Sequence, residues 1–416
     1  MQAILQTIRH EFLLKINKLD NIVPRALVIP AMPHKIKVII GMRRVGKTFY
    51  LLEKIQKLLA QGVPFSNILY LSLEDDRLQT FDAQQLSLMI EAFYALYPNN
   101  HRERCYLFLD EIHVVEGWSH FIRRLQDTKD VDIYLTGSSS KLLSTEIATE
   151  LRGRSISYEL WPFSFMEYCD AKKIFVKKPT GQIELDETKQ ILTQYLLEGG
   201  FPEIVLMPFS EKHIILQEYV DVVIYRDIIE RYKISNLSLV KQMLKILLKN
   251  PAIDITLNKF YHSLKSQGYS VGRTTVYDYL EYITDAYLAF MVPLYSESIK
   301  QIQANPRKIY VVDTGLCCSY NLNINLNLGH LFENMIYLDL RRRRDTIHYY
   351  ATDEKYNVDF LTRSLTGDLN LYQVAWDISD QETLKREQRA LNSAEKKLNI
   401  VGKIITPESY LKGDDF

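Results

Sequence analysis

Short apolar runs alternate with amphipathic stretches along the first 160 residues. Four runs, at residues 35–40, 67–73, 105–112 and 131–138, have the apolar composition of buried strands. An amphipathic helix, with Ile8, Phe12 and Ile16 among the residues of its apolar face, comes before them and leads into a connector that contains several prolines. A strand, a crossover helix and a second strand form a βαβ unit, so the pattern predicts an α/β fold with a parallel sheet.

The pattern becomes mainly helical beyond residue 160. Residues 161–235 are mostly helical, and three further helical patterns follow up to residue 290. In the last of them, residues 270–282, the apolar positions face a core and leave the polar ones outward, as in the second helix of a helix-turn-helix. The core positions are Val276, Leu280 and Ile283, and the outward ones are Arg273, Thr274 and Tyr277.

Strand-like runs at residues 286–295 and 308–312 are placed to form the wing of a winged helix. After an Asn-rich connector, a helix at residues 331–340 precedes three strand patterns, at residues 347–351, 357–361 and 371–376. The end of the chain therefore predicts a second α/β domain.

Composition adds limits to this picture. A chain of 416 residues exceeds what one hydrophobic core usually serves, so two or three domains are expected. Lys plus Arg (51) equals Asp plus Glu (51), so any basic surface for nucleic acid must be local. The four cysteines show no metal-ligand spacing, which indicates a reducing compartment. We find neither a signal-peptide pattern nor a membrane-length apolar run, so we expect a cytoplasmic protein.

The first strand runs into a phosphate-loop motif, Gly41-Met42-Arg43-Arg44-Val45-Gly46-Lys47-Thr48. The glycines allow the sharp turns that let backbone N–H groups wrap a triphosphate, and the helix that follows adds its partial positive charge. Lys47 is placed to reach the β- and γ-phosphates, and the Thr48 hydroxyl to bind Mg²⁺. We therefore predict ATP and Mg²⁺ as cofactors.

Two carboxylates, Asp110 and Glu111, end the third apolar run. Beside a phosphate loop, Asp110 can hold the Mg²⁺ shell and Glu111 can orient or deprotonate the attacking water. The fourth run ends in the serines 138–140. A hydroxyl there either contacts the γ-phosphate or the lytic water, or only caps the following helix.

These motifs resemble the prokaryotic AAA-superfamily ATPases whose C-terminal half is a domain of unknown function related to restriction-type nucleases. The resemblance is carried by residues 41–48, 109–112, 135–143, 151–154, 160–167 and 198–203. It implies an AAA-type sheet, with Ser138 at the sensor position and Arg152 or Arg154 as an arginine finger that acts from a neighbouring subunit in a homo-oligomer. Two solvated arginines are the alternative.

The resemblance also implies four parts in an α/β protein. These are an AAA-type P-loop ATPase core with a parallel sheet (1–160), a helical lid or connector (161–235), a winged-helix-like domain (236–320) and a restriction-endonuclease-like domain (321–416).

The nuclease-like part departs from its pattern. Glu333 and Asp359 fit the helix and strand carboxylates of that core, but Gln373-Val374-Ala375 stands where Glu-x-Lys is expected. Losing a ligand and the lysine weakens metal binding and removes the cation beside the nucleophile. A degenerate, non-cleaving core is the first interpretation, and an active site that has migrated to Lys385 or Glu387 is the alternative.

The leading functional hypothesis is an ATPase whose nucleotide state controls how the C-terminal half engages DNA, through Arg273 and the basic run Arg341–Arg344. A regulatory or scaffold NTPase that acts through protein partners is the first alternative. An ATP-dependent nuclease is the second. Membrane association is not expected.

Overall fold

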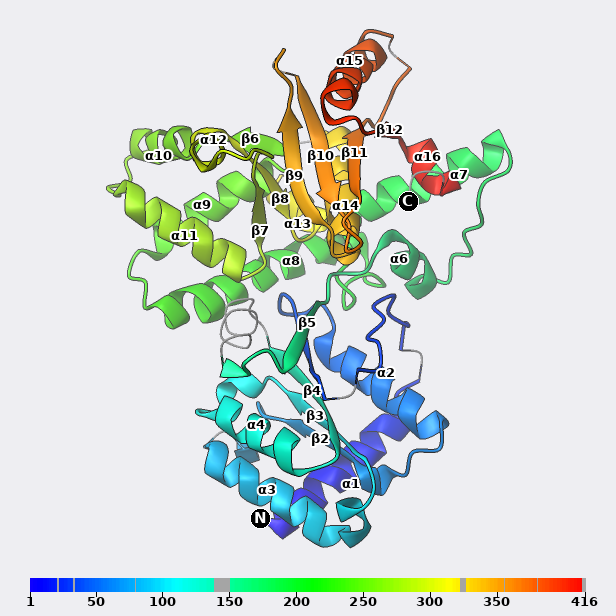
Figure 1. Cartoon of the computed structure of the whole chain (residues 1–416), viewed down its shortest axis with the longest axis vertical. Helices are drawn as coiled ribbons and strands as arrows, with labels where there is room; N and C mark the ends of the chain where they lie inside the picture. The colour runs from blue at the N-terminus through cyan, green and yellow to red at the C-terminus, as the bar shows by residue number, and fades with distance from the viewer. Residues whose placement is uncertain are drawn as a thin grey trace. The chain divides into compact units, whose positions relative to one another are not determined.

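The computed structural model divides the chain into two compact units, Met1–Leu160 and Trp161–Phe416 (Figure 1). It describes residues 1–20, 22–32, 34–78, 80–137, 150–321, 327–354, 356–379 and 381–413. No helix in these ranges is both long and apolar enough to cross a membrane. All four cysteines are free and buried, as expected of structural thiols.

The first unit is built on a five-stranded parallel sheet with the order β2-β3-β4-β1-β5. Its strands are β1 (Ile36–Ile40), β2 (Ile68–Ser72), β3 (Cys105–Asp110), β4 (Val131–Gly137) and β5 (Ser155–Glu159). The first four confirm the predicted apolar runs. β5 was not predicted, because its sequence Ser-Ile-Ser-Tyr-Glu is the half-buried pattern of an edge strand.

Helices cover both faces of this sheet. They are α1 (Gln2–Lys18), α2 (Lys47–Ala60), α3 (Ala83–Leu96) and α4 (Trp118–Thr128), with short 3₁₀ turns at Phe65–Asn67, Asp76–Leu78, Pro98–His101 and Ile112–Val114. The crossover from β1 to β2 runs along the sheet in the direction opposite to the crossovers β2–β3 and β3–β4. Right-handed connections therefore place α2 on one face and α3 and α4 on the other, as Figure 1 shows for α2 and α4.

This reversal of direction occurs between the neighbouring strands β1 and β4. Ligands of open parallel sheets bind in the crevice outside the carboxyl ends of the strands at such a switch point. The phosphate-loop motif follows the carboxyl end of β1, so the topology places it at the position where a ligand is expected.

The second unit begins with helices α6 (Phe165–Ala171), α7 (Gln182–Glu198) and α8 (Phe209–Val223), a π-helical segment (Ile224–Glu230) and, later in the chain, α13 (Thr314–Tyr320). Asp313 joins two of them: its carboxylate caps α13 and accepts a hydrogen bond of 2.7 Å from the N–H of Gly200. Gly199 has φ +79°, and a Cβ there would lie 2.1 Å from Asp313 Oδ1. The glycine that ends α7 therefore allows close packing against Asp313.

A three-stranded antiparallel sheet, with the order β6-β8-β7, comes next. Its elements are α9 (Leu237–Lys249), β6 (Ile253–Ile255), α10 (Leu257–Ser266), α11 (Arg273–Asp285), β7 (Ala289–Val292), α12 (Ile299–Ala304) and β8 (Arg307–Val311). The predicted faces of α11 are confirmed, since Val276, Leu280 and Ile283 are buried while Arg273 and Tyr277 are exposed.

The last part contains a four-stranded sheet with the order β12-β11-β10-β9. Its elements are α14 (Leu328–Arg342), β9 (Thr346–Ala351), β10 (Asn357–Arg363), β11 (Leu369–Val374), α15 (Gln381–Leu398), β12 (Gly402–Ile405) and α16 (Pro407–Lys412). β9, β10 and β11 are antiparallel, and β12 is parallel to β11.

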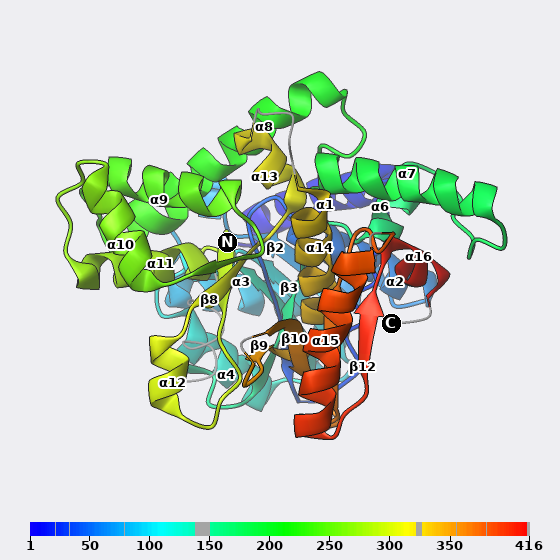
Figure 2. The same cartoon turned by 90° about the horizontal axis from the view of Figure 1, so that it is seen from above.

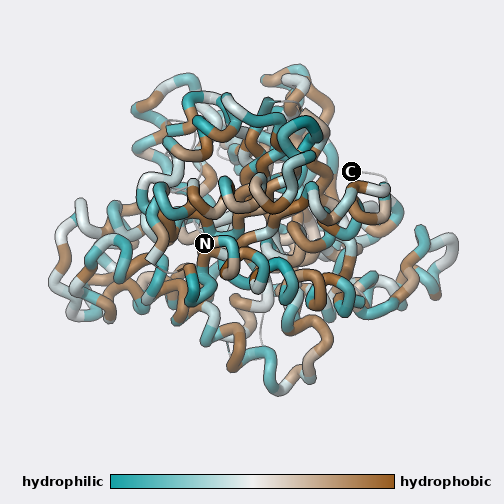
Figure 3. Tube along the Cα trace, turned by 90° about the horizontal axis from the view of Figure 1, so that it is seen from below, coloured by the Kyte–Doolittle hydropathy of each residue, from teal (hydrophilic) through white to brown (hydrophobic). Residues whose placement is uncertain are grey.

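The predicted helix and three strands of this part are confirmed, whereas β6 and β12 were not predicted from their short sequences. α15 packs along β10, β11 and β12 (Figure 2). Its Ala390, Leu391 and Ala394 form a core with Val358 and Leu371 of the strands. Hydrophobic and hydrophilic stretches alternate along the tube in Figure 3, as expected of helices that bury one face.

Candidate nucleotide site

The loop between β1 and α2 has an unusual backbone that depends in part on its glycines. Gly41 (φ +150°), Arg44 (φ +71°) and Gly46 (φ +98°) have positive φ angles. A Cβ on Gly41 would lie 2.2 Å from the carbonyl oxygen of Leu160, so no other residue fits there. Gly46 is the N-cap of α2 and has no side chain to satisfy the first N–H groups of the helix. These groups are left as donors for an anion.

Lys47, the first residue of α2, folds its ammonium group back into this loop. The side chain is 5% exposed, and Nζ donates to the carbonyl oxygens of Gly41 (3.1 Å) and Met42 (3.2 Å). The loop residues around it divide into buried Met42 and Val45 and more accessible Arg43 and Arg44. The Lys47 ammonium therefore lies on the concave side of the loop, which is where this motif binds phosphate oxygens.

Asp110 lies at the carboxyl end of β3 and collects three hydroxyl donors. Thr48 Oγ1 donates to Oδ2 at 2.7 Å, Tyr70 OH donates to the same oxygen at 3.0 Å, and Thr136 Oγ1 donates to Oδ1. The carboxylate is 2% exposed. Burial and the Asp110 charge raise the pKa of Tyr70, which therefore stays protonated as a donor.

Glu111 follows Asp110 in the left-handed conformation, with φ +56°. Its N–H donates to Thr136 Oγ1 at 2.8 Å. Oε1 lies 3.8 Å from Lys47 Nζ, and Oε2 lies 3.2 Å from Nδ1 of His113. Burial raises the pKa of Glu111, the Lys47 ammonium opposes this rise, and Asp110 adds to it. The result is a carboxylate next to the loop that accepts a proton more readily than an exposed glutamate does.

The donor set fits a hard cation. The Thr48 hydroxyl and the Asp110 carboxylate are adjacent oxygens, and Mg²⁺ in nucleotide sites takes one or two such protein ligands together with phosphates and waters. Across the described ranges there is no cluster of three or more His, Cys, Asp or Glu that would hold a metal by itself.

The structure brings four of the predicted site residues together, namely Lys47, Thr48, Asp110 and Glu111. Ser138 lies outside the described residues.

The two candidate finger arginines lie at the other end of the sheet. The N–H of Ile36, the first residue of β1, donates to the carbonyl oxygen of Arg154. Ile36 is four residues, or about 13 Å, from the end of β1. Arg152 is exposed, and Arg154 NH1 lies 2.6 Å from Asp127. Neither guanidinium is placed to reach the phosphate loop of its own chain.

Sequence reasoning missed two site residues that come from neighbouring strands. Thr136 hydrogen-bonds both Asp110 and the Glu111 backbone, and Tyr70 hydrogen-bonds Asp110. The sequence signal that could have identified Thr136 is a threonine near the end of the apolar run Val131–Gly137. The structure shows that this threonine is fully buried. A polar residue at the carboxyl end of a buried strand beside a phosphate loop is a candidate for the site.

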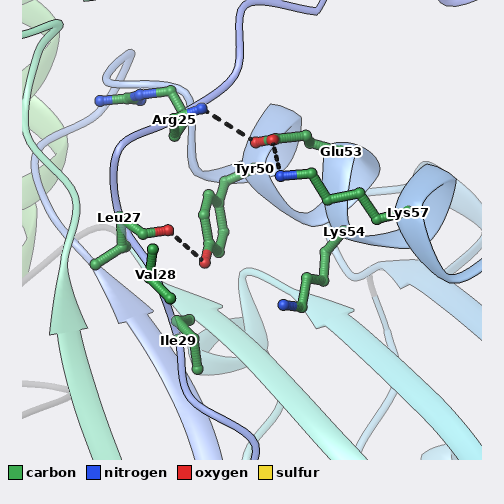
Figure 4. A pocket seen from close by; sticks show the side chains of 8 residues that line it. All are labelled: Arg25, Leu27, Val28, Ile29, Tyr50, Glu53, Lys54 and Lys57. Carbon is green, nitrogen blue, oxygen red and sulfur yellow. Dashed lines mark hydrogen bonds and ion pairs between the residues drawn. The ribbon is translucent and has the colours of Figure 1, made fainter.

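The N-terminal segment before β1 was also missed. Figure 4 shows this segment beside α2, with the Arg25 N–H donating to Glu53 (3.4 Å) and Tyr50 OH donating to the Leu27 carbonyl oxygen (3.2 Å). Arg25 NH1 also donates to the carbonyl oxygen of Val45, in the loop, at 2.9 Å. The segment and α2 enclose a cavity of about 90 Å³. The connector therefore supports the phosphate loop from outside.

The C-terminal carboxylates are also brought together, but around a residue that was not predicted. Lys308 Nζ lies 3.0 Å from Glu333 Oε1 and 2.6 Å from Asp359 Oδ1. Gln373 donates to Glu387 at 2.6 Å, so Glu387 is near this cluster. Lys385 is exposed.

The basic run Arg341–Arg344 is partly engaged inside the unit. Arg341 lies over the rings of Trp161 and Phe290, each at 5.5 Å from the ring centre. Arg342 bonds Asp339 and the Pro162 carbonyl oxygen. Arg343 and Arg344 are the exposed members of the run.

Residues 33–169 match the family model described as an AAA domain, and residues 189–327 match a domain of unknown function, DUF8612. Uncharacterized protein MJ1544 of Methanocaldococcus jannaschii is 37% identical over 400 residues, which cover 94% of this chain and 87% of that protein. An uncharacterized protein of Haemophilus influenzae is 30% identical over 370 residues, covering 88% and 89%.

Solved structures show more distant likenesses. The Walker-type ATPase PABY2304 of Pyrococcus abyssi has a TM-score of 0.45 and 13% identity, covering 68% of this chain and 90% of its own. The ORC1 protein of Aeropyrum pernix in complex with DNA has a TM-score of 0.29 and 12% identity, covering 82% and 94%.

Proposed function

We propose that this chain, which belongs to the family of MJ1544 of Methanocaldococcus jannaschii, binds ATP with Mg²⁺ and hydrolyses it. It carries an AAA-type ATPase domain at its N-terminal end. The observation that carries the proposal is the joint placement of Lys47, Thr48, Asp110 and Glu111 around a glycine-dependent loop. Lys47 and Thr48 begin α2, and Asp110 and Glu111 lie at the end of β3, far away in the sequence.

Each group has a separate role. The loop N–H groups and Lys47 bind and orient the phosphates, and a bound Mg²⁺ supplies charge neutralisation at the phosphate oxygens. Asp110 and Thr48 would hold the metal through their side-chain oxygens, and Tyr70 and Thr136 fix the position of the Asp110 carboxylate. Glu111 orients the attacking water and accepts its proton.

An arginine from a second copy of the chain completes this site in our proposal. A guanidinium stabilises the charge of phosphoryl transfer, and neither Arg152 nor Arg154 is placed to serve its own phosphate loop. Action in trans makes hydrolysis depend on a homo-oligomer.

We further propose that the nucleotide state controls DNA engagement by the second unit. The order α9–β6–α10–α11–β7–α12–β8, with an antiparallel sheet, supports a winged helix in which α11 is the recognition helix. Arg273 and Tyr277 are exposed on α11, and Arg343 and Arg344 are exposed elsewhere in the unit. In this proposal the three arginines supply phosphate contacts, although Arg343 also pairs with Asp345 and α11 carries Asp278 and Glu281.

The last part supports a restriction-endonuclease-like core in its element order. A helix, three antiparallel strands, a helix and a fourth strand parallel to the third follow one another from α14 to β12. The residues at its centre, where Gln373 and Ala375 replace the expected acid and lysine, support a core that does not cleave DNA.

A scaffold NTPase that acts through protein partners is the second proposal, because Arg341 and Arg342 are engaged within the unit and the acidic side chains of α11 reduce its positive charge. The deciding experiment is steady-state ATPase activity with and without double- and single-stranded DNA at low salt, for the wild type and Lys47→Ala. DNA binding, or a rate that changes with DNA in the wild type alone, supports the first proposal. ATPase activity with neither DNA binding nor a DNA effect supports the second.

A further inference from the structure

A buried charge cluster joins the two sheets of the second unit. Lys308 lies on β8, the central strand of the three-stranded sheet, while Glu333 lies on α14 and Asp359 on β10 of the four-stranded part. The three side chains are between 7% and 10% exposed. The ammonium bonds both carboxylates, at 3.0 Å and 2.6 Å.

Tyr310, Gln373 and the Val374 backbone add further hydrogen bonds to the cluster. Tyr310 OH donates to Glu333 Oε1 at 2.7 Å, and the Val374 N–H donates to Asp359 Oδ2 at 2.9 Å. Gln373 accepts from the Asp359 N–H at 3.2 Å and donates to Glu387. A buried network in which each group is bonded is rigid and specific, and removing one charge from it is costly.

The charges of the cluster support one another. Burial alone lowers the pKa of Lys308, but the Asp359 and Glu333 carboxylates outweigh it and raise the pKa overall, so the amine is charged. Burial, followed by the Asp359 charge, raises the pKa of Glu333, and the Lys308 ammonium opposes this rise.

These residues do not fit the metal site of a restriction-type nuclease. Such a core needs a third acidic ligand and a lysine on the next strand, where this chain has Gln373 and Ala375. The position between the two carboxylates that a divalent ion would take is filled by the ammonium. A cation of charge +2 and an ammonium cannot share it, because they repel and compete for the same oxygens.

We propose that Lys308 is the permanent cation of this carboxylate pair, and that it fastens the three-stranded sheet to the four-stranded part in a core that needs no metal. The positive charge that a nuclease would obtain from bound Mg²⁺ comes here from a lysine of the neighbouring sheet. The two carboxylates therefore have a structural role, as ion-pair partners of Lys308. This proposal is independent of ATP hydrolysis by the first unit.

The first test is a charge-balance series of thermal unfolding measurements on the full chain. Lys308→Met keeps the stem of the side chain and leaves two facing carboxylates, so we expect a markedly lower Tm at pH 8. The matched variant Lys308→Met/Glu333→Gln has one carboxylate fewer and should recover much of that loss. The proposal would be refuted by a Lys308→Met protein with the Tm of the wild type, or by a double variant with a Tm as low as that of the single variant.

The second test asks which cation the pair holds, with Tb³⁺ as a hard oxygen-seeking probe whose luminescence nearby tyrosines such as Tyr310 sensitise. The wild type and its Asp359→Asn variant should give the same signal, since the pair is closed to metal in both. This comparison does not require Lys308→Met to fold. Where Lys308→Met does fold, it is compared in the same way with Lys308→Met/Asp359→Asn.

A saturable additional signal in Lys308→Met that Asp359→Asn removes is the expected result. A wild-type signal that depends on Asp359 would show that metal enters beside Lys308, and it would refute the proposal. A folded Lys308→Met protein that gains no Tb³⁺ signal would refute it as well.

Discussion

Glu111→Gln separates nucleotide binding from hydrolysis. The amide has the shape of the carboxylate but cannot accept a proton from water. Two contacts that hold the rest of the site do not involve the altered atoms: the Thr48 hydroxyl donates to Asp110, and the Glu111 backbone N–H donates to Thr136. The change should therefore leave the binding geometry in place and remove only the proton acceptor.

The expected magnitude follows from this role. A positioned general base contributes about 10²- to 10⁴-fold to a rate, which corresponds to about 3–5 kcal/mol in the activation free energy. ATP affinity should be unchanged or higher, because the carboxylate lies 3.8 Å from Lys47 and competes with phosphate oxygens for the ammonium.

The same substitution should change stability in a pH-dependent way. Burial raises the pKa of Glu111, so the stability that the neutral carboxyl gives is complete below its unfolded pKa and is lost as pH rises through the folded pKa. Without nucleotide, Glu111→Gln should therefore unfold at a higher temperature than the wild type near pH 7. The difference should vanish at about pH 4, where the glutamate is protonated.

Single-turnover hydrolysis of labelled ATP and equilibrium binding of a fluorescent ATP analogue measure the two effects. The matched control is Glu116→Gln, an exposed glutamate on the same loop, which should hydrolyse ATP at the wild-type rate. Turnover by Glu111→Gln within a factor of about three of the wild type would refute the assignment, because a general base contributes far more. Another residue would then position the water.

Four other outcomes follow from the structure. Lys47→Ala should lower nucleotide affinity severely, since it removes the enclosed ammonium; titration with the same analogue checks this, and tight binding contradicts the site. Thr136→Val leaves two buried polar atoms without their shared partner, so urea unfolding should show a loss of about 2–4 kcal/mol, and turnover should fall while ATP still binds. Mixing Lys47→Ala protein with Arg152→Ala or Arg154→Ala protein should restore part of the ATPase activity, whereas no rescue, together with rates independent of protein concentration, indicates a monomeric enzyme. The wild type should not cut plasmid with Mg²⁺ or Mn²⁺, with or without ATP; cleavage that Asp359→Ala abolishes would restore the nuclease hypothesis.

The local parts of the ATPase domain could be predicted from the sequence because their causes are local. A short apolar run is buried in a parallel sheet wherever it occurs, and residues 105–110 therefore form a strand. The loop from Gly41 to Lys47 needs left-handed backbone at its glycines, and the spacing of those glycines is visible in the chain. Asp110 and Glu111 end a strand, so they reach the sheet edge without any information about distant contacts.

The edge strand of the sheet, Thr136 in the site and the placement of the two arginines depended on which segments become neighbours in the folded chain. β5 is recognisable only by its pairing with β1, because an edge strand of alternating polarity has no strong hydrophobic signal. Thr136 enters the site because β4 lies between β1 and β3, which places its hydroxyl against Asp110. The distance of Arg152 and Arg154 from the phosphate loop likewise comes from strand direction and register.

The cluster of Lys308, Glu333 and Asp359 shows most clearly the difference between what the sequence predicts and what tertiary contacts decide. The sequence placed Glu333 and Asp359 at the carboxylate positions of a nuclease core but identified no cation for them. The missing Glu-x-Lys pattern indicated that a metal would bind weakly. Lys308 lies in the earlier apolar run Lys308–Val312, which predicted only a wing strand. Because a buried charge is stable only beside its partner, the packing of β8 near α14 and β10 decided that this lysine faces the two carboxylates.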